Sequence, residues 1–466
     1  MKHKHINRRN FLSMAGCGAM GYTTLFNTLI NLRSMNAASI ANSAVYAGGD
    51  YKALVCLFLN GGNDSFNMLM PKQDDNEYDI YAETRSNNAI PQEDILALDG
   101  SNYGLHPSMT NVRDLYNDGK VSFITNAGTL IEPIDNKWQI WDGSAPTPLG
   151  LYSHSDQSQQ WQTSVPHDRT GVGWGGKIND LIHDMNENQG ISLNISLAGN
   201  NIFQTGNETA EYVLNPYSDT GAVTLNNYGF DWNFSEMLTQ GVDNMIEADY
   251  ADLFKKTYVD IVKVSRDANL EFVEALENVS LNTAFDEDAV SMRMELVAKT
   301  IAARDTLGMT RQIFFVEYGG WDHHDEVLNA QNEMLGYVDA GLNSFQAAME
   351  ELGIADCVTT FFVSEFSRTL TSNGNGTDHA WGGNMLVMGD AINGGQMFGT
   401  YPSLELGTDI ELGGGVLIPS LSCDEYFAEL ALWFGVAASD LSTIFPNIGN
   451  FYDTGSGDMP IGFLNL

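Results

Sequence analysis

The sequence predicts an α/β fold, an α/β/α sandwich built on a mainly parallel central sheet. The first observation is a set of apolar runs that are continuous rather than alternating, as expected of strands buried on both faces. The second is that helical segments lie between these runs, which is the order of β-α-β units with right-handed crossovers. The third is size, because 466 residues with 43% hydrophobic side chains can bury a large core.

The runs and the helical segments follow one another along the chain. The predicted strands are ALVCLFLN (53–60), VSFITNAG (121–128), ISLNISLAG (191–199), QIFFVEYG (312–319), CVTTFFVSEF (357–366) and NMLVMGD (384–390). Helices are expected over 108–120, 286–308 and 326–353, where a polar start and a terminal Gly mark the ends. Residues 200–285 begin in Asn/Thr/Gly-rich sequence and then turn helical, which predicts a helical insertion in a single domain of residues 48–466.

Residues 1–47 are expected to be an export signal and not part of the fold. Their basic start leads to Arg8 and Arg9, then Asn-Phe-Leu and a stretch of small and apolar residues. This pattern resembles a twin-arginine signal, so we expect the twin-arginine export machinery as a partner and a periplasmic or secreted location. A general secretory signal or a membrane anchor is the alternative. No later segment is long and apolar enough to span a membrane.

The charge balance excludes one class of partner. The chain has 60 Asp and Glu against 22 Lys and Arg, for a formal charge of −38. Such a surface repels phosphate backbones, so we expect no nucleic-acid binding. An anionic substrate would need local positive charge, and a bound metal ion is one source of it.

Polar residues follow three of the predicted strands. The stretch FFVEYGGWDHHDE (314–326) ends a strand at Gly-Gly and then supplies acids and histidines. A polar loop is the ordinary interpretation, but carboxylates and imidazoles are also the ligands of divalent cations. Ligands bind beyond the carboxyl ends of strands in such sheets, so these residues are expected to converge. The residues expected at this edge are Asp64, Asp322, His323, His324, Glu365, Arg368, Asp378 and His379.

The segment LYSHSDQSQQWQTS (151–164) adds candidate catalytic residues. Ser153 at a helix start would act as a nucleophile if metal ions faced it, or would simply cap the helix, and both interpretations stay open. His154 follows it directly. Arg368 is one of few cations near the predicted site, and its planar guanidinium suits a tetrahedral oxyanion.

Six motifs together resemble one protein family. They are VCLFLNGGNDSFNML, YSHSDQSQQWQT, GVGWGGKI, GGWDHHDE, SEFSRT and GTDHAWGG, in this order between about residues 50 and 400. The set is similar to the DUF1501 family of exported bacterial proteins, which carries an alkaline-phosphatase/sulfatase-like fold. The resemblance implies one or two divalent metals at the carboxyl edge of the sheet and hydrolysis of phosphate or sulfate esters. The metal ligands that it implies are Asp64, Asp322, His324, Glu365 and His379.

The motifs also depart from the phosphatase pattern. The pair Asp322 and His324 is closely spaced, and Glu365 is followed by Phe and not by His. One implied site keeps a His/carboxylate set, whereas the other, built on Asp64 and Glu365, is oxygen-rich and better suited to Mg, Mn or Ca than to Zn. A single-metal or catalytically silent protein is the other interpretation.

The expected function is therefore an exported metal-dependent hydrolase. Its substrate would be a small-molecule or glycan phosphate or sulfate ester, and the metal would be Zn, Mn, Mg or Ca. The alternative is a non-catalytic exported binding or assembly protein that retains the fold, with or without one structural metal.

Overall fold

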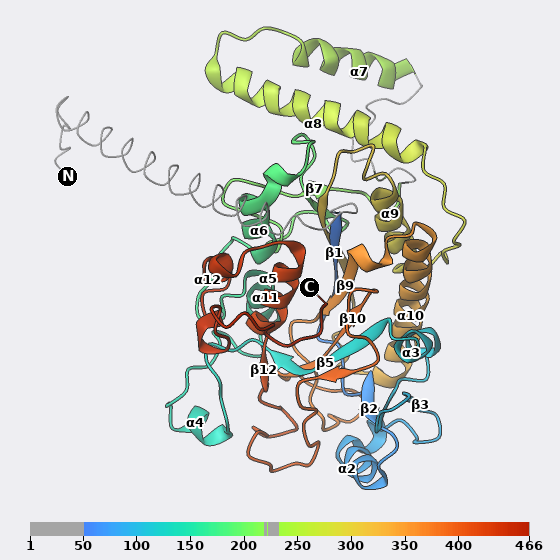
Figure 1. Cartoon of the computed structure of the whole chain (residues 1–466), viewed down its shortest axis with the longest axis vertical. Coiled ribbons are helices and arrows are strands. Elements are labelled where there is room, and N and C mark those ends of the chain that lie inside the picture. Colours follow the sequence, from blue (N-terminus) through green and yellow to red (C-terminus); the bar gives the residue numbers. More distant parts are fainter. Residues whose placement is uncertain (1–50, 219–220, 222–232, 466) are drawn as a thin grey trace, which may run out of the picture.

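The main sheet has the strand order β11-β5-β10-β9-β1-β8-β6-β7, with β12 beside β5 (Figure 1). The computed structural model describes residues 51–218, 221 and 233–465, so the predicted signal in residues 1–47 lies outside the described residues. Within the described sheet only β10 runs antiparallel to its neighbours. The predicted α/β fold with a mostly parallel sheet is confirmed.

The long strands match the apolar runs closely. The strands of the main sheet are β1 Lys52–Asn60, β5 Val121–Gly128, β6 Asn194–Ser196, β7 Tyr212–Val213, β8 Arg311–Gly319, β9 Val358–Val363, β10 Gly383–Met388, β11 Met397–Phe398 and β12 Leu421–Ser422. The run at 191–199 is thus mostly irregular, with only three residues in β6. A second small sheet, which the sequence did not predict, has the order β2-β4-β3 and contains β2 Leu69–Pro71, β3 Leu96–Ala97 and β4 Tyr103–Leu105.

Strand β1 shows why the apolar runs are continuous. Its odd-numbered residues from Ala53 to Leu59 belong to one buried cluster, and its even-numbered residues Leu54, Cys56 and Phe58 belong to another. Each face of the sheet is therefore covered by its own hydrophobic core.

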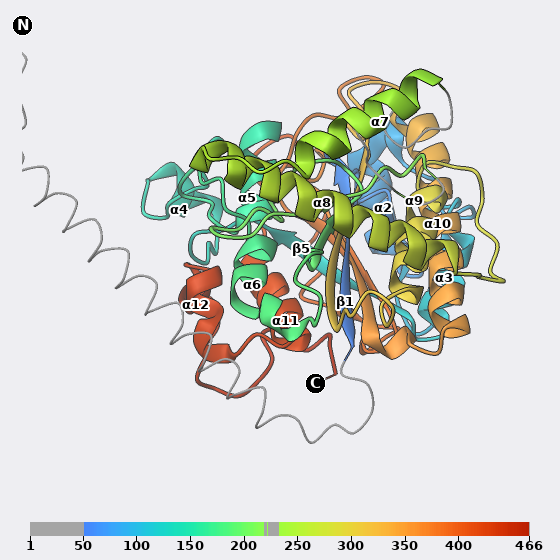
Figure 2. The same cartoon turned by 90° about the horizontal axis from the view of Figure 1, so that it is seen from above.

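Two groups of helices provide these covers, one on each side of the sheet (Figure 2). The first core includes side chains of α3 Thr110–Asn117, α9 Ser291–Ala302 and α10 Val327–Glu351. The second includes side chains of α5 His154–Thr163, α6 Trp174–Ile182, α11 Cys423–Phe434 and α12 Leu441–Ile444. Two further helices, α2 Asp75–Arg85 and α4 Lys137–Trp141, lie outside these layers (Figure 1).

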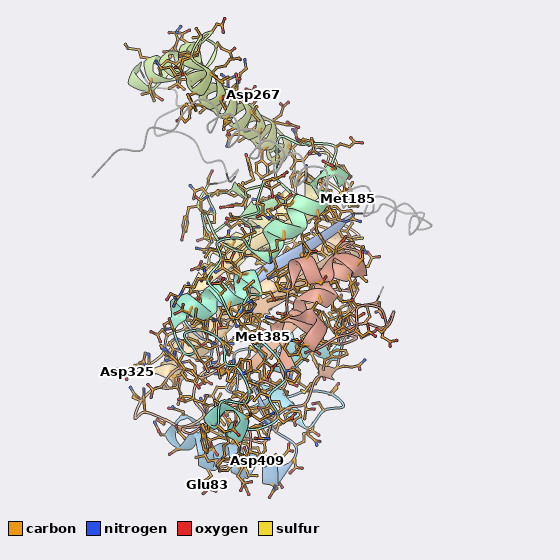
Figure 3. All side chains as sticks on the ribbon, turned by 90° about the vertical axis from the view of Figure 1, so that its left-hand side faces the viewer. Glu83, Met185, Asp267, Asp325, Met385 and Asp409 are labelled. Atoms are coloured by element: carbon orange, nitrogen blue, oxygen red, sulfur yellow. The ribbon has the colours of Figure 1, made fainter. Side chains whose placement is uncertain are left out.

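Helices α7 Asn233–Ile246 and α8 Leu253–Glu277 form a hairpin, in which Asp243 of α7 pairs with Arg266 of α8. We call this hairpin the arm. The arm projects from one end of the molecule, where Figure 3 labels Asp267, far from Glu83 and Asp409 at the other end. The arm falls in the helical part of the predicted insertion at 200–285, but β7 of the same segment pairs with β6 and joins the sheet. In the described part of the chain, no helix combines the length and the apolar character needed to cross a membrane.

Candidate metal centre

The predicted site residues emerge from one edge of the sheet. Strands β1 and β8 are parallel and end in register at Asn60 and Gly319, and β9 ends beside β1 with Val363 opposite Phe58. The loops that follow therefore start side by side. Gly61, with a φ of +127°, lets two of them touch, because a Cβ there would lie 2.5 Å from the backbone nitrogen of Asp322.

Three histidines converge on one carboxylate oxygen, Oδ1 of Asp322. The Nε2 atoms lie 3.0 Å away for His324, 3.2 Å for His379 and 3.5 Å for His154. The Nε2 atoms of His324 and His379 are themselves 3.0 Å apart. Ligand atoms of His154, Asp322 and His379 all lie within 4.8 Å of one another.

The other ring nitrogen of each histidine is held by an acceptor. Nδ1 lies 2.7 Å from Oε1 of Glu365 in His154, 3.1 Å from Oδ1 of Asp378 in His324, and 2.8 Å from the carbonyl oxygen of Tyr152 in His379. Carbonyl and ionised carboxylate oxygens only accept, so Nδ1 must carry the proton and donate. When the three rings are neutral, the Nε2 atom of each therefore carries no proton. Its lone pair is directed at the space between the three rings and Asp322, which we call the shared centre.

Such a set of facing acceptors requires a cation between them. Two bare nitrogens and a carboxylate oxygen at 3.0–3.2 Å repel one another unless a proton or a metal ion lies among them. With metal–nitrogen bonds of about 2.0–2.1 Å, the ligands of a tetrahedral ion are about 3.3 Å apart. The observed spacing and the backing of each imidazole by an acceptor both fit a divalent metal.

The pKa values of the two more enclosed histidines, His154 and His379, are shifted in opposite directions. The hydrogen bond to Glu365 and the charge of that carboxylate raise the pKa of His154. Burial lowers the pKa of His379, against a smaller raising effect of the Tyr152 carbonyl. Tyr152 itself adopts a left-handed φ of 72°, which is uncommon for a bulky residue and sets the position of this carbonyl.

Arg368 holds the carboxylate and is not open to a ligand. Its side chain is fully buried and donates to Oδ1 of Asp322 at 2.9 Å, to the carbonyl of Gly61 and to both oxygens of Thr377. Partial burial raises the pKa of Asp322, but the hydrogen bond and the charge of Arg368 lower it by more. The pKa of Asp322 therefore lies below its usual range. The predicted oxyanion contact is thus replaced by a positioning contact, because the guanidinium donors already have protein acceptors.

The two remaining predicted ligands do not join the three histidines. Asp64 is fully buried and forms an ion pair with Arg85, so its charge is already neutralised. Glu365 is also fully buried, and its Oε1 accepts from the backbone nitrogen of Gly61 and from His154. The oxygen-rich second site expected from these two acids is therefore replaced by an ion pair and by a support for an imidazole.

Ser153 has the contacts of a helix cap. It precedes α5, and its Oγ accepts from the backbone nitrogen of Asp156 at 3.4 Å and lies 3.2 Å from Oγ of Ser155. These contacts are those of the capping interpretation.

Some groups of the site were not among the predicted ligands or catalytic residues. Asp378 stands next to His379 in the motif GTDHAWGG, which was a usable signal, but its contact with His324 spans 54 positions. The Tyr152 carbonyl is a backbone group, and Arg85 lies in a helix without any motif, so neither had a signal in the sequence.

Comparisons with known proteins agree with the motif resemblance in part. The family model described as "Protein of unknown function (DUF1501)" matches residues 251–411, a range that contains Asp322, His324 and His379 but not His154. No curated protein sequence matches the chain.

Three solved structures that are similar to the chain are distant from it in sequence. The PsFucS1 sulfatase from Pseudoalteromonas sp. aligns with 88% of this chain and 72% of its own, at 10% identity and a TM-score of 0.34. Ps i-CgsB in complex with k-i-k-neocarrahexaose aligns with 86% of this chain and 77% of its own, at 10% identity and a TM-score of 0.34. A TAB5 alkaline phosphatase mutant with Mg bound in its M3 site aligns with 72% of this chain and 90% of its own, at 10% identity and a TM-score of 0.23. Likenesses this distant leave the activity to be inferred from the residues of the site.

Proposed function

We propose that the chain is a metal-dependent hydrolase of phosphate or sulfate esters that uses a single metal centre. The observation that carries the proposal is the convergence of three acceptor-backed histidines on Asp322 at the carboxyl edge of the sheet. Together with His154 and His379, Asp322 would hold the ion, and His324 lies close enough to complete the set.

Neighbouring groups of the chain hold the ligands of this centre in place. Glu365, Asp378 and the Tyr152 carbonyl fix the tautomers, and Arg368 fixes the carboxylate. A divalent cation bound there supplies Lewis acidity and positive charge for the oxygens of a tetrahedral ester. In a chain with a formal charge of −38, that local positive charge would also draw an anionic substrate to the site.

The ligand set favours a borderline metal. Three imidazoles with one carboxylate suit Zn better than Mg, Mn or Ca, which prefer oxygen-rich sites. This choice among the four expected metals follows from the ion pair of Asp64 with Arg85 and from the contact of Glu365 with Nδ1 of His154, which leaves neither acid as a ligand beside the Nε2 atoms.

The second candidate function is a non-catalytic binding protein that keeps one structural metal. The ion pair between Asp64 and Arg85 favours it, because this pair takes up the acid that would otherwise serve a second ion. The capping contacts of Ser153 support the same function, since a helix cap needs no catalytic role for this serine.

The test is metal content and turnover measured on the same purified protein. We expect about one equivalent of metal by elemental analysis and metal-dependent hydrolysis of an aryl phosphate or an aryl sulfate. Asp322→Asn should lose both, whereas Asp325→Asn, a matched change in the same exposed loop, should keep both. One bound metal without turnover of either ester class would favour the binding protein, and no bound metal would reject both functions.

Export by the twin-arginine route is part of the proposal. It rests on the pattern of Arg8, Arg9 and the following Asn-Phe-Leu. The change of both arginines to lysine should abolish export while leaving synthesis unchanged. Continued accumulation of the double variant outside the cytoplasm would indicate the general secretory route.

A further inference from the structure

Helix α4, at the periphery of the molecule, carries two exposed tryptophans (Figure 1). Trp138 and Trp141 are 56% and 57% exposed, whereas the other tryptophans that the structure describes are at most 2% exposed. The two rings pack edge to face, with centroids 5.0 Å apart and an interplanar angle of 90°. Because only the edge of one ring meets the other, flat aromatic surface of both rings stays open to solvent.

A buried cation fixes the position of the two rings. Only 8% of Lys137 is exposed, and its Nζ lies 5.9 Å from the ring centroid of Trp138 and 5.6 Å from that of Trp141. The same Nζ donates to the carbonyl oxygens of Gly407 and Thr408 in the loop 406–411. The rings are thus held on this loop before any ligand arrives, so a ligand that covers them restricts few further side-chain rotations.

A cavity lies next to α4 along the chain. Its volume is about 360 Å³, within the range of about 300–1,000 Å³ that is typical of small-molecule sites. Residues 133–135, which lead into α4, line it together with Ile410, which follows the backbone acceptor of the Lys137 N–H in the loop 406–411. The cavity and the tryptophan pair therefore share one segment of chain and one supporting loop. The polar side chains of the lining are those of Asp135, Ser420, Glu425 and Asn450.

This combination of groups fits a carbohydrate. The C–H face of a pyranose ring stacks on an indole ring, and sugar hydroxyls donate to carboxylate, amide and hydroxyl oxygens such as those of the cavity. The charged groups of the described lining are the carboxylates of Asp135 and Glu425, which disfavour an anionic ligand. A protein partner fits less well, because two half-exposed indole rings supply roughly 250 Å², against the about 800 Å² that a stable interface buries on each partner.

We propose that the tryptophan pair and the cavity bind a glycan, and that the sugar units held there carry no sulfate or phosphate group. The rings stack on sugar faces, and the cavity takes up a neighbouring unit of the same chain. As a substrate of the metal centre, such a glycan carries its ester on another unit, and this step rests on the proposed function. Binding itself needs neither the metal nor turnover, so the two proposals can fail separately.

The glycan surface and the metal centre share a hydrophobic cluster. This cluster includes Ile140 of α4, Tyr152, whose carbonyl oxygen accepts from His379, and Trp381, two residues after that histidine. Protein interiors are close-packed and transmit little free movement. The separation between the two sites is therefore fixed, and a glycan bound at one is held at a defined distance from the other.

The first test is the binding of polysaccharides, measured by affinity gel electrophoresis and by tryptophan fluorescence. The probes are dextran, laminarin and xylan, which are neutral, and dextran sulfate, which is the charged counterpart of dextran. At least one neutral polysaccharide should retard the protein, and dextran sulfate should retard it no more than dextran does. Chelated wild type and Asp322→Asn should bind like the untreated wild type, because neither change touches the glycan surface.

The second test assigns the binding to this surface. Trp138→Ala with Trp141→Ala should weaken binding about tenfold or more, and Trp138→Tyr with Trp141→Tyr should keep most of it. The matched control is Phe254→Ala with Tyr258→Ala, because these rings are 87% and 70% exposed on the arm and should leave binding unchanged. Ser420→Phe, which narrows the cavity, should also weaken binding. Circular dichroism of all these variants should match that of the wild type.

Several results would overturn the proposal. They are a lack of binding to all three neutral polysaccharides, preferential binding of dextran sulfate, and binding that survives either the loss of both rings or the narrowing of the cavity. Binding of a deca-proline peptide by the two rings in place of a polysaccharide would also overturn it, because proline-rich segments dock on exposed aromatic rings. A protein that binds a neutral polysaccharide through the rings but hydrolyses neither ester class would support this proposal and reject only the proposed hydrolase.

Discussion

Removal of the metal should destabilise the fold by an amount that the site allows us to work out. Without a cation, acceptor atoms of Asp322, His324 and His379 face one another at 3.0–3.2 Å. A metal at a hundredfold excess over its dissociation constant stabilises the folded state by about 2.7 kcal/mol. For a chain of 466 residues the unfolding entropy is about 1 kcal/mol per degree, so the melting temperature should fall by about 3 °C on chelation.

The assay is a melting curve with and without chelator, followed by a titration of metal back into the chelated protein. The melting temperature should recover in proportion to the logarithm of the metal concentration. Asp322→Asn should lose this response, and Asp325→Asn should keep it, because Asp325 lies outside the group of ligand atoms. If chelation leaves the wild-type melting temperature unchanged and elemental analysis finds no metal, the metal centre is refuted.

Three further changes test individual contacts. Glu365→Gln should weaken metal affinity by about 10–100-fold, measured by competition with a chromogenic chelator, because it weakens the acceptor that orients His154. Ser153→Ala should cost about 1 kcal/mol in denaturant unfolding through loss of the cap, and a complete loss of turnover would instead restore the nucleophile interpretation. Burial raises the pKa of Asp424 to about 7, so its contribution to stability is full below about pH 4 and is lost as the pH rises through about 7. Melting curves between about pH 5 and pH 8 should therefore be flatter for Asp424→Asn than for the wild type, and an unchanged slope would contradict this assignment.

The parts of the fold that could be predicted are those with a strong local signal. Continuous apolar runs identified β1, β5 and β8 nearly to the residue, since a strand buried on both faces must be apolar throughout. Strands of two or three residues, such as β7 and β11, have no periodicity to detect. Their pairing is fixed by the neighbouring strand.

The candidate site was likewise predictable from the sequence only in part. The order of strands and loops indicated that Asp322, His324 and His379 would meet, because residues after parallel strands share an edge. The choice between ligand and support could not be made, because it depends on contacts such as that of His154 with Glu365 across 211 positions. The pairing of Asp64 with Arg85 was equally hidden, since nothing in the helix sequence indicates which way the arginine turns.

The buried position of Arg368 has a consequence for how the centre would acquire its ion. The guanidinium of Arg368 links three loop segments through hydrogen bonds to Gly61, Asp322 and Thr377. The entropy cost of ordering these loops is therefore incurred when the chain folds. Binding of the metal ion then needs little rearrangement of the loops. We expect loading to be rapid and independent of folding, so that the ion can be exchanged in the native protein without passing through an unfolded state.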